Sequence, residues 1–194
     1  MTDAVANAKR ALRAELRERR RTMTEPEREA ASSRLTQHLI GLASDLDVRR
    51  IAAYLSRPDE PDVRPFVDWA WRQGVKVLLP VSRNDGLLDW APYDAGAEDA
   101  DHLGMPTPTS ELLSPLAINE VDLIVVPAAS VDRTGMRMGW GRGYFDKTLG
   151  SMEKCPPVYA VLFDSEVVDE VPRERHDRPV DGVVTPSGIT HFSR

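Results

Sequence analysis

Gly139, Gly141 and Gly143 stand at alternate positions in the part of this sequence best suited to binding chemistry. Glycine allows the backbone to turn tightly, so that several N–H groups can point at one anion. A helix beginning after the glycines would add the positive end of its dipole, while Arg137 and Arg142 supply mobile positive charge. The spacing fits neither a Walker loop nor the dinucleotide fingerprint. It predicts a phosphate-binding turn, although an ordinary turn between strand and helix has the same pattern.

Carboxylates accompany the glycine segment. Asp146 falls in the first turn of the helix predicted after the glycines, where an acid often only complements the helix dipole. Nucleotide phosphates usually carry magnesium, which takes one or two carboxylates together with phosphate oxygens and water. A second carboxylate is available at Asp177 or Asp181, although these acids also fit an ordinary polar loop. Both interpretations remain open at this point.

The first 22 residues are basic in an otherwise acidic chain. They hold seven Lys and Arg against three Asp and Glu, a net charge of +4, whereas the remaining 18 bases and 28 acids give −10. Lys9 and Arg13 lie four residues apart and share one face of a predicted helix, with Arg10 beside them. Such a stretch is usually a solvated face. The alternative is that these cations reach the phosphates of a nucleotide.

Two further side chains are candidates for contact with a planar ligand. Glu60 follows a predicted strand within a proline-rich turn, and a carboxylate there can accept N–H groups from a heterocycle such as a pterin. An ordinary turn residue is the simpler interpretation. Trp140 lies inside the glycine segment, where a large side chain has little reason to be buried and can stack on a ligand.

The pattern of apolar residues predicts how these groups are positioned. Helices are expected over residues 1–22, 25–42 and 63–73, the second with a capping box formed by Thr24 and Glu27. Continuous apolar runs at 51–55, 75–79, 123–126, 158–163 and 183–184 are typical of parallel strands covered on both faces. Residues 94–119 show no sustained period and predict a long connection that borders the site. The expected fold is an α/β sandwich.

Composition excludes several classes of protein. The chain has 194 residues, of which 41% are hydrophobic and 29% charged, as expected for a single globular domain over residues 1–194. Its single cysteine, Cys155, excludes an internal disulfide and a multi-cysteine metal site. No apolar run approaches the roughly 20 residues of a membrane helix, and no secretion signal is recognisable. We therefore expect a cytoplasmic protein without a membrane partner, and a monomer. The net charge of −6 argues against general nucleic-acid binding.

These segments together resemble the 5-formyltetrahydrofolate cyclo-ligase family, also called the 5,10-methenyltetrahydrofolate synthetases. The resemblance covers most of the chain in order, and its most specific part is the glycine block with its Tyr-Phe-Asp ending. The matching segments are residues 9–13, 54–56 with Glu60, 122–127, Asp132, 137–146, 171–172 and 176–181.

The resemblance implies an α/β fold with a mostly parallel sheet flanked by helices, related to ribose-5-phosphate isomerase and CoA-transferases. It also implies a reaction that uses ATP and Mg²⁺. In such enzymes ATP phosphorylates the formyl oxygen of 5-formyltetrahydrofolate, N10 attacks the activated carbon, and phosphate leaves as 5,10-methenyltetrahydrofolate forms. No protein nucleophile is required, since phosphoryl transfer depends on positioning and charge neutralisation.

By the same resemblance, Arg137 and Tyr144 are expected in catalysis, and Asp146 and Asp177 as magnesium ligands. The implied ATP contacts are Lys9, Arg10, Arg13, Arg137, Met138, Gly139, Trp140, Gly141, Arg142, Gly143, Tyr144 and Phe145. The implied contacts to 5-formyltetrahydrofolate are Leu55, Glu60, Trp140, Gly141, Arg142, Gly143 and Tyr144.

Three positions depart from the family pattern: Thr107 replaces a frequent glutamate, Val63 a common threonine and Ala128 a frequent glycine. Two other functions are weighed against the enzyme. A folate or nucleotide binder without turnover would keep the fold, but the presence of both Asp146 and Asp177 weighs against it. RNA binding by the arginine-rich helix is disfavoured by the acidic remainder of the chain and the lack of clustered aromatic residues.

Overall fold

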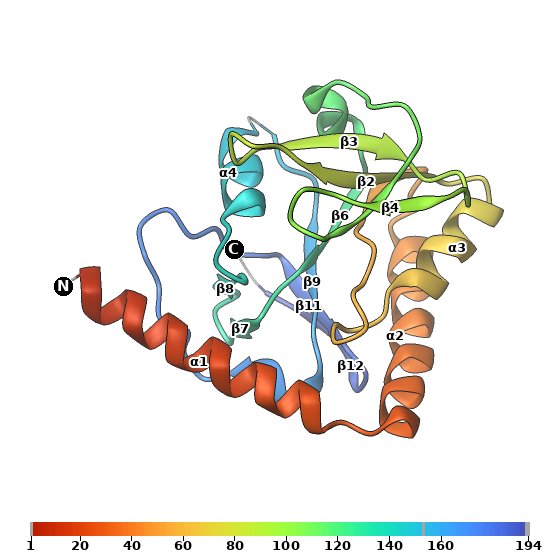
Figure 1. Ribbon diagram of the computed structural model, residues 1–194. Helices are drawn as coiled ribbons and strands as arrows, with labels where there is room; N and C mark the ends of the chain where they lie inside the picture. Colours follow the sequence, from red (N-terminus) through yellow and green to blue (C-terminus); the bar gives the residue numbers. More distant parts are fainter. Residues whose placement is uncertain (1, 153, 193–194) are drawn as a thin grey trace.

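A seven-stranded sheet forms the centre of the computed structural model, which describes residues 2–152 and 154–192 (Figure 1). The strand order is β12-β11-β9-β6-β1-β2-β3. The five inner strands pair in parallel and the two edge strands pair antiparallel, as the continuous apolar runs predicted. The strands are β1 (Arg50–Ala52), β2 (Lys76–Ser82), β3 (Leu88–Pro92), β6 (Leu123–Pro127), β9 (Val158–Val161), β11 (Gly182–Thr185) and β12 (Gly188–His191).

Both faces of the central sheet are buried, because successive side chains of its strands point to opposite sides. Ile51 packs with Leu39 and Phe66 on the face covered by α2 and α3. Ile124 packs with Leu149 on the face covered by α4. No helix of the described residues is long and apolar enough to cross a membrane. The helices are α1 (Thr2–Thr22), α2 (Glu25–Asp45), α3 (Arg64–Arg72) and α4 (Tyr144–Ser151).

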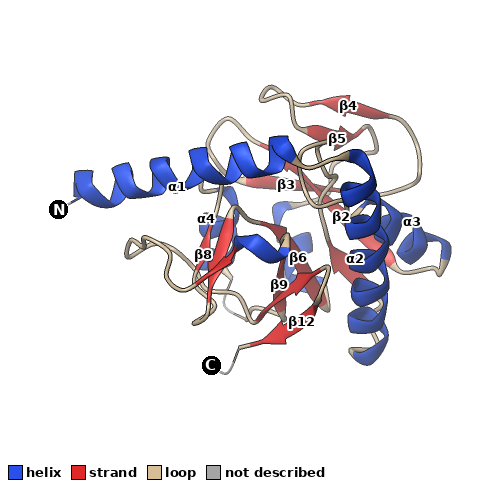
Figure 2. Ribbon diagram, turned by 90° about the horizontal axis from the view of Figure 1, so that it is seen from below, coloured by secondary structure: helices blue, strands red, loops and turns tan. Residues whose placement is uncertain are grey.

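Helix α1 lies apart from the central sheet and packs on a small three-stranded sheet of order β10-β7-β8 (Figure 2). Leu16 of α1 is fully buried and belongs to one apolar cluster with Met138 and Val171. This packing brings one face of α1 beside the loop of residues 139–143, here called the glycine loop. The small sheet consists of β7 (Ser130–Asp132), β8 (Arg137–Met138) and β10 (Val167–Val168), and the 3-10 helix η2 (Asp164–Glu166) precedes β10.

The helices begin close to their predicted starts. Helix α2 begins after the predicted capping box, in which the side chain of Glu27 accepts the backbone N–H of Thr24 at 2.7 Å. It continues three residues beyond its predicted end at residue 42. Helix α3 begins one residue after its predicted start, and its N-cap position is Val63. The side chain of Asp62 accepts the backbone N–H of Arg64, the first residue of α3, at 3.0 Å. Strand β1 is shorter than predicted, because the chain leaves the sheet after residue 52 to form the loop that carries Leu55.

The connection at residues 94–119 contains regular structure that the sequence pattern did not predict. Strands β4 (Glu98–Ala100) and β5 (Pro106–Pro108) pair as a hairpin, and the 3-10 helix η1 (Pro115–Glu120) follows. Asp101 closes the hairpin by accepting the backbone N–H groups of Leu103 and Met105 at 2.8 and 2.9 Å. Strands of three residues are too short to produce a readable period, which explains the missed hairpin.

Candidate active site

A cavity of about 360 Å³, here called the central cavity, lies at the carboxyl ends of β1, β2 and β6 beside the glycine loop. Leu55 follows β1, Ser82 ends β2 and Pro127 ends β6, and all three line this cavity. Met105 contributes from the hairpin of β4 and β5. Open α/β sheets bind ligands at the carboxyl ends of their strands, so the location is that of a ligand site.

Glu60 supplies a buried carboxylate to the central cavity. Only 9% of its surface is exposed, and its Oε2 accepts the backbone N–H of Arg57 at 2.9 Å. Burial raises the pKa of Glu60, while the bond from Arg57 opposes this rise. Among the described residues, no hydrogen-bond donor contacts Oε1 of Glu60. The carboxylate is therefore positioned to accept N–H groups from a ligand in the cavity.

A second cavity, of about 290 Å³ and here called the basic cavity, lies between α1 and the glycine loop. Lys9, Arg10 and Arg13 line it from α1, as the charge asymmetry of the sequence suggested. Gly139, Gly143 and Asp146 line both cavities, so the two meet at the glycine loop. The complete lining of the basic cavity is Ala6, Lys9, Arg10, Arg13, Gly139, Gly141, Gly143, Asp146, Glu174, His176 and Asp177.

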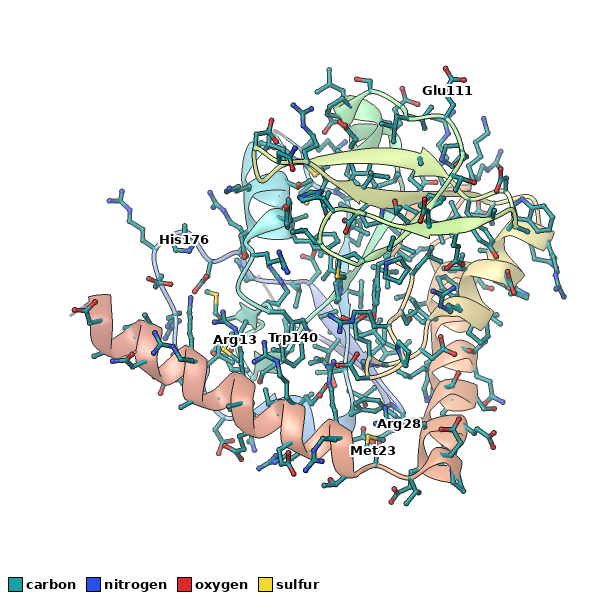
Figure 3. The ribbon with its side chains drawn as sticks, in the orientation of Figure 1. Arg13, Met23, Arg28, Glu111, Trp140 and His176 are labelled. Carbon is teal, nitrogen blue, oxygen red and sulfur yellow. The ribbon has the colours of Figure 1, made fainter. Side chains whose placement is uncertain are left out.

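The glycine loop requires glycine at two positions. Gly141 and Gly143 have φ angles of 100° and 72°, which side chains rarely tolerate. A β-carbon on Gly141 would also lie 3.3 Å from Nη1 of Arg13. Nε of Arg13 donates to the carbonyl oxygen of Gly139 at 2.8 Å, and Arg13 and Trp140 lie close together above α1 in Figure 3. Helix α1 thus holds the loop by its backbone.

Lys9 binds two carboxylates in the basic cavity. Its Nζ donates to Oδ2 of Asp177 at 2.6 Å and to Oε2 of Glu174 at 2.8 Å, and only 5% of the residue is exposed. Burial by itself would lower the pKa of Lys9, but the two carboxylates outweigh that effect and raise it. Glu174 also donates its backbone N–H to Asp177 at 2.7 Å, which fixes the turn before β11.

Asp146 forms an ion pair with Arg137. Its Oδ1 accepts from Nη2 of Arg137 at 2.5 Å and from the backbone N–H of Arg178 at 3.3 Å. Arg137 is 3% exposed, so this carboxylate faces a desolvated cation. Asp146 and Asp177 both line the basic cavity and offer only oxygen donors. Hard oxygen ligands of this kind suit Mg²⁺, so the residues present fit that ion.

The comparison with known proteins decides the family. The model of the 5-formyltetrahydrofolate cyclo-ligase family matches residues 5–186 of this chain. The chain belongs to this family. It is therefore an enzyme, an ATP-dependent ligase of folate one-carbon metabolism that converts 5-formyltetrahydrofolate to 5,10-methenyltetrahydrofolate.

Relatives extend along nearly the whole chain. The 5-formyltetrahydrofolate cyclo-ligase of Mycolicibacterium smegmatis is 37% identical over 184 residues, covering 92% of this chain and 94% of that protein. The Escherichia coli cyclo-ligase is 29% identical over 179 residues, covering 90% and 98%. The NMR structure of Aquifex aeolicus 5,10-methenyltetrahydrofolate synthetase, at 24% identity, covers 96% of this chain and 93% of that one with a TM-score of 0.81. This last likeness supports the α/β fold.

In this cyclo-ligase, the side chains expected at the site do not all reach a cavity. Met138 is 1% exposed and packs against Leu16, so its side chain lines neither cavity. Phe145 lines the central cavity and also packs on the core. Tyr144 lines the central cavity, but its hydroxyl donates to the carbonyl oxygen of Arg83 at 3.1 Å. Tyr144 therefore contributes its ring to the cavity wall, and its hydroxyl proton is engaged elsewhere.

Trp140, for which the sequence offered little reason for burial, is half-buried in the structure. Its indole packs with the apolar cluster around Leu16, and the guanidinium carbons of Arg17 and Arg20 lie 5.2 and 4.7 Å from its ring centroid. The ring also lines the central cavity. Trp140 is therefore half-buried, because its packing partners lie about 120 residues away in sequence, on α1.

Two other acids of the cyclo-ligase, Asp132 and Asp181, accept hydrogen bonds from the backbone. Asp132 accepts backbone N–H groups from Thr134, Met136 and Val171 at 2.9, 3.1 and 3.3 Å. Burial alone would raise the pKa of Asp132, but the hydroxyl of Thr134, which donates at 2.6 Å, and these backbone N–H groups lower it. Asp181, the alternative second metal ligand, instead accepts the backbone N–H of Val158 at 2.8 Å and does not line the basic cavity.

Two charged residues beside the site were not predicted from the sequence. Glu174 lies three residues before Asp177, a spacing that places both carboxylates on one turn and offered a weak signal. Arg20 belongs to the basic N-terminal segment, but its sequence neighbours Arg19 and Arg21 are exposed and nothing in the pattern separates it from them. Its burial follows only from the packing of α1.

Proposed function

We propose that the enzyme binds 5-formyltetrahydrofolate in the central cavity and the phosphates of ATP in the basic cavity. One observation carries this assignment: the two cavities meet at Gly139, Gly143 and Asp146. A γ-phosphate at that junction faces a formyl group in the neighbouring cavity. Bringing the two substrates together in this way converts an encounter in solution into a reaction within one complex.

The phosphates are held by charge and by backbone amides. Lys9, Arg10 and Arg13 supply cations from α1, and the glycine loop supplies N–H groups next to the start of α4. Arg137 stands beside Asp146, where negative charge develops during transfer. Arg142 adds a further cation at the wall of the central cavity. Such groups stabilise a transferring phosphoryl group electrostatically.

The reaction proceeds in two steps without a protein nucleophile. The formyl oxygen attacks the γ-phosphorus, the bond from that phosphorus to the bridging oxygen breaks, and ADP leaves with the bonding electrons. The N10 amine then attacks the activated formyl carbon and loses its proton, and the carbon–oxygen bond breaks as inorganic phosphate departs. The product is the 5,10-methenyl ring. The protein contributes orientation and charge neutralisation.

The folate head group is recognised in the central cavity. Glu60 accepts N–H groups from the pterin ring, and Leu55 packs against the ring. Trp140 and Tyr144 supply aromatic walls near the junction with the basic cavity. Apolar and aromatic side chains line this cavity together with several arginines, and Glu60 is its most deeply buried acid. A concave site with a few placed polar groups suits a flat heterocycle that carries several donors.

Asp146 and Asp177 would hold Mg²⁺ with the phosphates of ATP. The ion would neutralise phosphate charge and orient the γ-phosphate. Lys9 and Arg137 form ion pairs with these same carboxylates, Lys9 with Asp177 and Arg137 with Asp146.

Isotope transfer tests the chemistry directly. The purified protein is supplied with MgATP and with 5-formyltetrahydrofolate labelled with ¹⁸O at the formyl oxygen. We expect absorbance of the methenyl product to appear only with ATP, and the label to emerge in inorganic phosphate. Phosphate without label would contradict phosphorylation of the formyl oxygen. Binding of both ligands without turnover would instead support the non-catalytic binder.

A further inference from the structure

Arg20 is a buried cation that none of the assigned ligand contacts includes. It lies near the end of α1, is 2% exposed, and lines the central cavity. Its Nε and Nη2 donate to the two carboxylate oxygens of Glu166 at 2.5 and 3.0 Å, and Nη2 also donates to the carbonyl oxygen of Ala128 at 3.1 Å. Glu166 is 1% exposed, so the ion pair is removed from water. Burying such an ion pair costs free energy. The hydrogen bonds of Arg20 involve only Nε and Nη2.

The guanidinium of Arg20 also lies against aromatic rings. Its Nη1 is buried and has no hydrogen-bond partner among the described residues. The guanidinium carbon instead lies 4.7 Å from the ring centroid of Trp140 and 5.6 Å from that of Phe163. Ring faces attract a cation, and the attraction is strongest where water is excluded. The guanidinium of Arg20 therefore combines hydrogen bonds to Glu166 and Ala128 with a cation–π contact to Trp140.

Trp140 connects this contact to the ligand loop. It stands between Gly139 and Gly141, two residues without side chains that could restrain the loop by packing. Its ring lines the central cavity, and α1 also grips the loop at the carbonyl oxygen of Gly139 through Arg13. The ring of Trp140 is thus the one large side chain by which packing can hold residues 139–141. A contact that restrains the ring of Trp140 therefore also restrains this part of the wall of the central cavity.

We propose that Arg20 is a positioning residue for folate binding: Glu166 orients its guanidinium, and the guanidinium holds the ring of Trp140 in the wall of the central cavity. Arg20 does not touch the reacting atoms. Its effect on the reaction passes through Trp140, so the two residues should act on folate binding as a unit. This inference rests on the proposed location of folate in the central cavity.

A double-mutant cycle tests the proposal. Arg20→Met alone leaves the buried carboxylate of Glu166 without its cation, with only the backbone N–H of Phe163 as a donor, so the charges are removed together in R20M/E166Q. We expect R20M/E166Q and Trp140→Ala each to raise the KM for 5-formyltetrahydrofolate about tenfold, with the KM for ATP nearly unchanged. The triple variant R20M/E166Q/W140A should show the same KM as W140A alone. Folding of each variant is checked by circular dichroism and thermal melting.

The matched control is R21M/E18Q, which removes an exposed ion pair from the same turn of α1 and should leave both KM values unchanged. An unchanged folate KM in R20M/E166Q would overturn the proposal. A folate KM raised about a hundredfold in the triple variant would also overturn it, because the two changes would then act independently.

Tryptophan emission gives a readout that does not require turnover. The Trp140 contribution is the difference between the wild-type spectrum and that of Trp140→Phe, and we expect R20M/E166Q to change it in the ligand-free protein. An unchanged contribution would contradict the contact between Arg20 and Trp140. A wild-type protein without cyclo-ligase turnover would defeat the proposed function, while this measurement would still test the contact.

Discussion

Nζ of Lys9 lies 2.6 Å from Oδ2 of Asp177, a contact that joins residues 168 positions apart. Both side chains are buried, and both line the cavity assigned to the phosphates of ATP. The first helix thereby contributes directly to a site whose acids lie near the other end of the chain. The position of Lys9 beside two carboxylates also keeps its ammonium group charged.

Lys9→Met should weaken ATP binding. The variant removes a desolvated cation from the basic cavity, and we expect the KM for ATP to rise about tenfold or more, with a smaller effect on the KM for folate. Steady-state kinetics with each substrate varied would measure both values. The control is Arg19→Met, which loses an exposed ion pair with Glu15 on the same helix. If the KM for ATP of Lys9→Met equals that of the wild type, Lys9 does not bind the phosphates of ATP.

Asp146→Asn should abolish most activity while the fold persists. The amide keeps an oxygen that can accept from Arg137, but it loses the charge that attracts a divalent ion. We expect kcat/KM to fall at least about a hundredfold, with only a small change in melting temperature. Activity would be measured over a magnesium titration, with Asp45→Asn at the exposed end of α2 as the control. Turnover near that of the wild type would reject Asp146 as a metal ligand.

Glu60 should give folate binding an acidic limit. Burial raises its pKa above the ordinary value of 4.5, and the ionised carboxylate is the form that accepts pterin N–H groups. Folate affinity should be constant above that pKa and should fall as the pH drops through it. In Glu60→Gln this decline should be absent and the folate KM raised at neutral pH. A variant that retained the wild-type pH profile of folate binding would exclude Glu60 as the responsible group.

Asp132 should stabilise the turn that leads into β8. Asp132→Asn places an N–H₂ group against backbone donors, and we expect a loss of about 1–3 kcal/mol in the free energy of unfolding at pH 7. The folded-state pKa of Asp132 is lowered below 3.8. Its contribution is therefore present above pH 3.8 and is lost as the pH falls through the folded-state pKa.

Urea unfolding of wild type and Asp132→Asn at several pH values would measure this difference, which should narrow in acid. Asp169→Asn, at an exposed ion pair with Arg133, is the matched control and should unfold like the wild type. Equal stability of Asp132→Asn and wild type at pH 7 would show that the turn does not depend on the charge.

Local patterns predicted most of the regular structure. The capping box of Thr24 and Glu27 marked the start of α2, and the apolar runs located five parallel strands. The signals behind these predictions lie within a few residues of one another, so they are readable without knowledge of the fold. The short hairpin of β4 and β5 and the strand β3 lacked such a signal.

The glycine loop, its cations and Asp146 were likewise candidates by residue type and spacing, whereas only the family resemblance favoured Asp177 over Asp181. The partners of these side chains could not be predicted from the sequence. Lys9 meets Glu174, and Arg20 meets Glu166 and Trp140, across separations of 120 to 165 residues. Pairing between side chains so far apart in sequence depends on how α1 packs against the small sheet. That packing cannot be predicted from the residues near each side chain in the sequence. The amino-acid order thus indicated candidate groups for the chemistry, and the packing of α1 set which of them meet.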